Sequence, residues 1–185
     1  MDNYLTLLGS IVIGGLMLVN FMNYQADLSE HTYSHTLDLV LQETAIEVVE
    51  MVERDLCKIG RGVRQPAFAI YAQDDISFYA DLENDGVIDT VRYYVSSTSA
   101  ATSTPNPNDR IFYRVVNGAN EFEWAVGLTA FQIKFYDASN DTTSNLFKAR
   151  ALEVSMSFES TISYDEEYAS YSWRGRITPP NLLSL

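Results

Sequence analysis

The chain has 185 residues, one cysteine and a formal net charge of −13, from 25 acidic and 12 basic residues. This excess of acid excludes a nucleic-acid-binding surface, because phosphate binding needs a basic face. The single cysteine, Cys57, excludes an intrachain disulfide, and we expect its thiol to be half-buried on a helix. No G-x-S-x-G, H-E-x-x-H, P-loop or Rossmann glycine pattern occurs, so we expect neither an enzyme nor a small-molecule substrate.

The first expected element is one long helix that begins with an apolar run. Residues 4–22 carry no charge, and the run approaches the ~20 apolar residues that a bilayer-spanning helix needs. Neither Pro nor Gly interrupts residues 21–59. We therefore assign residues 1–24 to an apolar membrane or filament-core helix, and residues 25–62 to an amphipathic continuation of the same helix.

The continuation repeats apolar residues at close to helical spacing, which predicts one face packed on a folded head. The predicted contact residues are Leu37, Leu41, Ile46, Val49, Val52, Leu56 and Ile59. Gly60 and Gly62 are expected to end the helix, because glycine tolerates the left-handed backbone that closes many helices.

From residue 63 to residue 185 the apolar pattern changes to an alternation of period two, which predicts an antiparallel β head. The predicted strands are residues 67–73, 76–82, 87–95, 110–116, 121–126, 128–137 and 149–159. Residues 96–109 are expected to be a polar loop with nothing to bury, and residues 164–173 a tail rich in tyrosine and acid. The fold class is therefore α+β: a long N-terminal helix, apolar then amphipathic, packed on an antiparallel sheet.

One acidic segment has part of the spacing of a calcium-binding loop. Its carboxylates are those of Asp81, Glu83, Asp85 and Asp89. They stand at positions 1, 3, 5 and 9 of such a loop, with glycine at position 6. Arg92 stands at position 12, where a bidentate acid is usual. The alternative is an acidic hairpin turn without metal, and no other cofactor is expected.

The order of helix and sheet resembles that of the type IV pilin and pseudopilin superfamily. Residues 53–60 (ERDLCKIG) resemble the segment that closes the long helix in minor pilins of the PilW kind and in J-type pseudopilins of type II secretion. Residues 81–94 (DLENDGVIDTVRYY) resemble the acidic hairpin that follows in those proteins. Residues 128–137 and 149–154 resemble their later paired strands.

The resemblance implies a structural subunit of a type IV pilus-like filament or of a secretion pseudopilus. Such a subunit crosses the inner membrane once before assembly. It then packs through the same helix against other pilin subunits in an extracellular or periplasmic filament.

The family's processed N-terminus carries a glutamate at its fifth position. Leu5 stands there if Met1 is the mature start, with Asp2 as a candidate replacement; otherwise a leader precedes the sequence given. The alternative function, from another class, is a membrane-anchored extracytoplasmic binding domain with an aromatic-rich sheet.

Overall fold

A computed structural model of the chain describes residues 2–64, 67–163 and 166–182. Within these residues, one long helix is followed by seven strands and two short 3-10 turns, which confirms the predicted α+β class. The chain divides into two compact units, Met1–Leu39 and Val40–Leu185. Because this boundary falls inside the helix, residues 25–62 contribute to both units.

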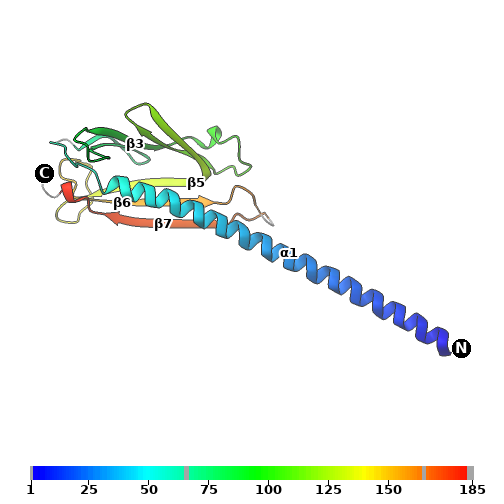
Figure 1. Cartoon of the computed structure of the whole chain (residues 1–185). Coiled ribbons are helices and arrows are strands. Elements are labelled where there is room, and N and C mark those ends of the chain that lie inside the picture. The colour runs from blue at the N-terminus through cyan, green and yellow to red at the C-terminus, as the bar shows by residue number, and fades with distance from the viewer. Residues whose placement is uncertain (1, 65–66, 164–165, 183–185) are drawn as a thin grey trace. The chain divides into compact units, whose positions relative to one another are not determined.

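Helix α1 spans Asp2–Leu56 without interruption (Figure 1), so it is one long helix as predicted but ends before the predicted bound at residue 62. It is followed by turns in which Gly60 (φ 76°) and Gly62 (φ 71°) adopt the left-handed backbone, as expected for residues that close a helix. Cys57 comes directly after the helix and is exposed, so the prediction of a half-buried thiol on the helix is wrong.

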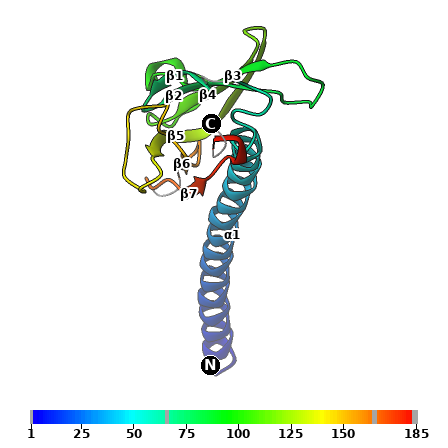
Figure 2. The ribbon, with the colours of Figure 1, turned by 90° about the vertical axis from the view of Figure 1, so that its left-hand side faces the viewer.

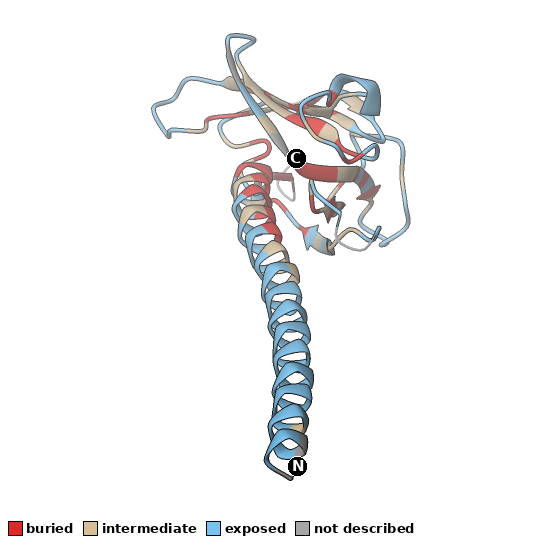
Figure 3. Cartoon of the chain, turned by 90° about the vertical axis from the view of Figure 1, so that its right-hand side faces the viewer, coloured by how far each residue is buried: buried red, intermediate tan, exposed pale blue. Residues whose placement is uncertain are grey.

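The last turns of α1 bury one stripe of side chains in the core of the second unit (Figure 3). The stripe consists of Leu41, Ala45, Val48, Val49, Val52, Leu56 and, beyond the helix, Ile59. Most of the predicted contacts belong to it, but Ile46 is 47 % exposed and Leu37 is only half-buried. A four-residue step from Leu41 reaches Ala45, and Ile46 lies about 100° further round the helix, which turns it to solvent.

The seven strands form one antiparallel sheet in chain order, so the predicted succession of hairpins is confirmed. The strands are β1 Phe68–Ala72, β2 Asp75–Ala80, β3 Asp89–Val95, β4 Arg110–Val116, β5 Asn120–Tyr136, β6 Ala151–Glu159 and β7 Ser170–Ile177. Strand β3 begins two residues later than predicted, because residues 81–88 form a wider acidic loop in place of a tight turn.

Strand β5 joins two segments that the sequence predicts as separate strands. It runs through Gly127, where the register with its neighbours shifts. Its first part pairs with β4 and its second part with β6, so β5 belongs to both halves of the sheet. Figure 2 shows the result: β1–β4 lie in one layer, β6 and β7 lie in another, and β5 joins the two.

The fold of the sheet brings β1 back onto the second part of β5. The amide of Ile133 donates to the carbonyl oxygen of Gln73 at 3.0 Å. The ring centroids of Tyr71 and Phe135 lie 4.7 Å apart, edge to face, and Phe68 meets the same phenylalanine at 5.0 Å. The core therefore lies between the two layers and the buried stripe of α1.

Strand β7 is a strand that the sequence analysis missed. The sequence predicts a tail rich in tyrosine and acid over residues 164–173, of which 164 and 165 lie outside the described residues, but Ser170–Ile177 pairs along its length with β6. The alternation was present: Tyr171, Trp173 and Ile177 alternate with Ser and Arg residues. The tyrosine-rich and acid-rich segment just before the strand led the sequence analysis to overlook this alternation.

Replacing Gly127 by alanine is expected to cost about 3 kcal/mol of stability, whereas Gly118→Ala costs about 1 kcal/mol. Both glycines have left-handed backbone, with φ of 75° and 70°. A Cβ at Gly127 would overlap the carbonyl oxygen of Glu159, but a Cβ at Gly118 would meet nothing within 4 Å. Urea unfolding measures the free energy of unfolding of both variants, and the difference between them gives the cost of the steric overlap at Gly127. Equal losses of stability in the two variants would contradict the close approach of β5 to β6.

Candidate functional site

In the apolar segment of α1 (residues 4–22), no side chain that the structure describes is buried. The helix contains an 18-residue window of mean hydropathy 1.6, none of it buried, and is long and apolar enough to cross a membrane. Its exposed large side chains are Tyr4, Leu7, Leu8, Ile11, Val12, Ile13, Leu16, Met17, Leu18, Val19, Phe21 and Met22. An apolar surface of this extent marks a site that contacts lipid or another protein.

The polar groups of the apolar segment are compatible with a medium that excludes water. Ser10 donates its hydroxyl to the carbonyl of Leu7 at 2.8 Å, and the Asn20 amide donates to the carbonyl of Leu16 at 2.9 Å. Both side chains therefore use the helix itself as their partner, which lowers the cost of placing them among lipid tails or helices.

Small residues give the apolar segment places where another helix can approach closely. A Cβ built at Gly9, Gly14 or Gly15 would meet no atom within 4 Å, so their spaces are filled by nothing in the described chain. In membranes, helix pairs bring their backbones together at such small residues, since the contact there depends on close packing.

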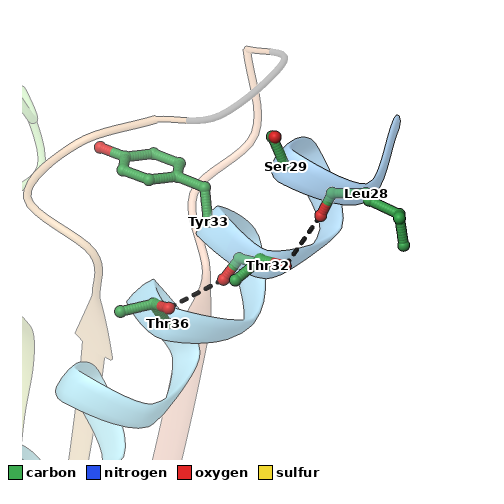
Figure 4. A pocket seen from close by; sticks show the side chains of 5 residues that line it. All are labelled: Leu28, Ser29, Thr32, Tyr33 and Thr36. Carbon is green, nitrogen blue, oxygen red and sulfur yellow. Dashed lines mark hydrogen bonds between the residues drawn. The ribbon is translucent and has the colours of Figure 1, made fainter. Parts of the chain in front are cut away.

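A hollow of about 430 Å³ on α1 lies outside the apolar segment and is lined by Leu28, Ser29, Thr32, Tyr33 and Thr36 (Figure 4). Its hydroxyl groups are largely committed to the helix. Thr32 donates to the carbonyl of Leu28 and Thr36 to that of Thr32, each at 2.8 Å, and Ser29 donates to that of Gln25 at 2.9 Å. We assign it no ligand.

The carboxylates of the acidic loop support the loop itself. Asp81 is 6 % exposed and accepts hydrogen bonds from the amides of Asp85 and Gly86 at 3.1 and 3.0 Å. Asp89 accepts from the amide of Leu82 at 3.2 Å and from the Asn117 side chain at 2.8 Å. These contacts are those of an acid-stabilised turn.

The two remaining members of the predicted calcium loop are exposed. Asp85 accepts a hydrogen bond from the amide of Val87 at 2.8 Å, and Glu83 lies at the surface of the loop. Among the described residues, no group of three or more His, Cys, Asp or Glu side chains is gathered as a metal site. Calcium binding by Asp81, Glu83, Asp85 and Asp89 stays a prediction.

A buried ionic cluster, which the sequence analysis did not identify, fastens the end of α1 to the sheet. The Arg114 guanidinium on β4 donates from both Nε and Nη2 to Asp55 Oδ2, each at 2.7 Å. Tyr93 on β3 donates its hydroxyl to the same oxygen at 2.7 Å and accepts from Arg114 Nε at 3.1 Å. The cluster forms only when α1, β3 and β4, which are distant in the sequence, come together in the fold. The apolar periodicity of the helix therefore could not predict it.

Burial, followed by the charge of the Asp55 carboxylate, raises the pKa of Tyr93 well above its ordinary value. The phenol therefore stays protonated at all working pH values and acts as a permanent donor. With side chains 15 % and 6 % exposed, Arg114 and Asp55 form a pair that is largely withdrawn from water. This is the arrangement of a structural clamp, in which each polar group is satisfied by the others.

A half-exposed aromatic row consists of Tyr94 on β3 and Tyr113 on β4, flanked by Arg92 on β3 and Asp75 on β2. Tyr94 and Tyr113 stack with ring centroids 4.8 Å apart, and the Arg92 guanidinium lies 4.7 Å from the centroid of the Tyr94 ring. Arg92 also pairs through two hydrogen bonds, of 2.9 and 2.6 Å, with Asp75. These contacts hold the row rigid on the outside of the sheet.

Comparison of the chain with protein-family models, with curated proteins and with solved structures finds no match.

Proposed function

We propose that this chain is a pilin-like structural subunit, a minor pilin or pseudopilin, of a type IV pilus-like filament or of a type II secretion pseudopilus. The observation that carries the proposal is the uncovered apolar segment on a helix whose last turns belong to the core of a β head. A subunit of this kind needs both features: a helix that packs into a filament, and a folded head that the same helix carries.

The physical basis of assembly is an exchange of apolar partners. Before assembly the apolar segment spans the inner membrane, and its side chains contact lipid tails. In the filament the same side chains contact the helices of other pilin subunits, so their surface is never transferred to water. Gly9, Gly14 and Gly15 supply the close approaches between backbones.

The clamp supports the same proposal, because a filament subunit transmits force between its helix and its head. The hydrogen bonds of Asp55 join α1 directly to β3 and β4. An ionic cluster withdrawn from water resists separation more than an exposed one, since each group would lose its partners on opening.

Cysteine cross-linking tests the proposal. In a Cys57→Ser background, one cysteine is introduced at Leu8 or at Leu16, which are 61 % and 60 % exposed. We expect cross-linked dimers in sheared surface material, because one thiol per chain can join only two subunits, with filaments visible by electron microscopy and this chain identified in them by mass spectrometry. A cysteine at Ser139, in an exposed turn of the head, is the control and should give fewer cross-links.

The alternative, an anchored extracytoplasmic binding domain, is favoured by the aromatic row of Tyr94 and Tyr113. Such a domain would insert in the membrane equally well but stay monomeric there. Cross-links absent at both helix positions, in a chain that is nevertheless membrane-bound, would support this alternative and contradict the filament subunit.

A further inference from the structure

The loop of residues 96–109 is fastened to the end of β6, contrary to the expectation that it buries nothing. Asn106 is 2 % exposed, and its amide donates to Glu159 Oε2 at 3.0 Å and to the carbonyl of Ser160 at 3.1 Å. The Asn108 amide donates to the same Glu159 oxygen at 3.1 Å. The composition of the loop predicts that it is exposed to solvent, but two of its asparagines donate hydrogen bonds to Glu159 of β6.

At the end of this loop, Asp109 is an acid that the fold buries without a partner. It is 1 % exposed, and among the described residues neither of its carboxylate oxygens accepts a hydrogen bond of ordinary geometry, since the nearby Thr104 hydroxyl donates to the carbonyl of Ala101 at 3.4 Å. Its neighbour Arg110 does not neutralise it: Arg110 Nε is itself buried without a partner, and its Nη1 lies 3.9 Å from Asp74. An ionised carboxylate in this state costs several kcal/mol unless a cation or a proton compensates it.

Asp109 and Glu159 lie within electrostatic reach of each other. Burial is the largest cause that raises the pKa of Asp109, and the negative charge of Glu159 adds to it; the nearby Thr104 hydroxyl opposes the rise in part. The two asparagine amides use Glu159 Oε2, which leaves Oε1 for another partner. The buried Asp109 carboxylate therefore lies close enough to the half-buried Glu159 to feel its charge, and Gly127 of β5 closely approaches the Glu159 backbone.

We propose that Asp109 and Glu159 bind a calcium ion that joins the loop of residues 96–109 to the end of β6. Two carboxylates match the charge of a divalent cation, and neutral oxygens of the loop would complete the coordination. Calcium fits better than magnesium, because it accepts six to eight oxygen ligands in irregular arrangements, whereas magnesium requires a near-octahedral set and retains waters. The site is separate from the acidic loop, and the proposal does not depend on the proposed function.

Thermal unfolding of the full chain in detergent micelles, with calcium chloride or with a chelator, tests this site. At calcium concentrations about 100-fold above its dissociation constant, we expect the midpoint to rise by about 5–10 °C. Asp109→Asn should abolish the rise, and Glu159→Gln should reduce it. Asp81→Asn is the matched control: it removes one charge from the acidic loop and should leave the rise unchanged.

The following outcomes would contradict calcium binding by Asp109 and Glu159. A wild-type chain with no calcium-dependent shift would contradict the calcium site, whether or not the variants fold. A shift that persists in Asp109→Asn, or one lost only in Asp81→Asn, would place the calcium elsewhere. If Asp109→Asn does not fold, an unreduced shift in Glu159→Gln excludes the site.

Discussion

Two aspartates introduced together at Ile13 and Leu16 are expected to remove the chain from the membrane fraction. Both side chains are exposed on the apolar segment, at 58 % and 60 %. A charged residue at the centre of a membrane helix costs about 2.5–3.5 kcal/mol, so the pair costs about 5–7 kcal/mol. The partition into membrane should therefore fall by a factor of about 10⁴, which fractionation and immunoblotting measure directly.

The matched control places two aspartates on the same helix outside the apolar segment, at Gln25 and Ser29, which are also exposed. This variant should stay with the membrane. Neither variant should shift the melting of the second unit, because no residue of Met1–Leu39 belongs to its core. A double variant at Ile13 and Leu16 that remains membrane-bound would show that another part of the chain holds it there.

This experiment separates anchoring from assembly. A filament subunit and an anchored binding domain both need the apolar segment, so both lose the membrane in the Ile13 and Leu16 variant. Only the filament subunit also gives cross-links at Leu8 and Leu16. Membrane fractionation and cross-linking together therefore distinguish three cases: a chain that is not anchored in the membrane, a chain that is anchored but stays monomeric, and a chain that assembles.

The features that the sequence revealed are those governed by local pattern. The apolar segment depends on composition alone, and the β strands depend on alternation between neighbours. Both therefore appear in the structure close to where they were expected. The error at Ile46 has the same origin. Helical spacing allows either Ala45 or Ile46 to be buried, and the larger apolar residue was predicted, but the structure buries Ala45.

The features that the sequence concealed depend on contacts between distant segments. The sequence predicts separate strands over residues 121–126 and 128–137, whereas the structure has one strand that passes through Gly127 with left-handed backbone. The sequence predicts Asp109 as part of an exposed polar loop, although it is buried. The residues next to an acidic residue in the sequence do not indicate whether its side chain is buried in the fold.

Asp55→Ala is expected to destabilise the second unit by about 3–5 kcal/mol, the usual loss when one partner of a buried ion pair is removed. The alanine would leave the Arg114 guanidinium, whose side chain is 15 % exposed, without its carboxylate. It would also leave the Tyr93 hydroxyl without its acceptor at 2.7 Å. Urea unfolding of the full chain in detergent measures the loss.

Glu50→Ala is the control on the same helix, since Glu50 is exposed and should change stability by less than about 0.5 kcal/mol. A loss below about 1 kcal/mol in Asp55→Ala would contradict the clamp.

The apolar replacement of the whole cluster shows what the clamp contributes beyond stability. In a triple variant, Asp55→Leu, Tyr93→Phe and Arg114→Met remove all the charges and hydroxyls together. We expect most of the stability lost in Asp55→Ala to return, because buried ion pairs are often matched by apolar groups of similar volume. If cross-linking in sheared material then falls while stability is restored, the ionic cluster serves to fix how the end of α1 is held against β3 and β4. Stability and cross-linking that both return would assign it to folding alone.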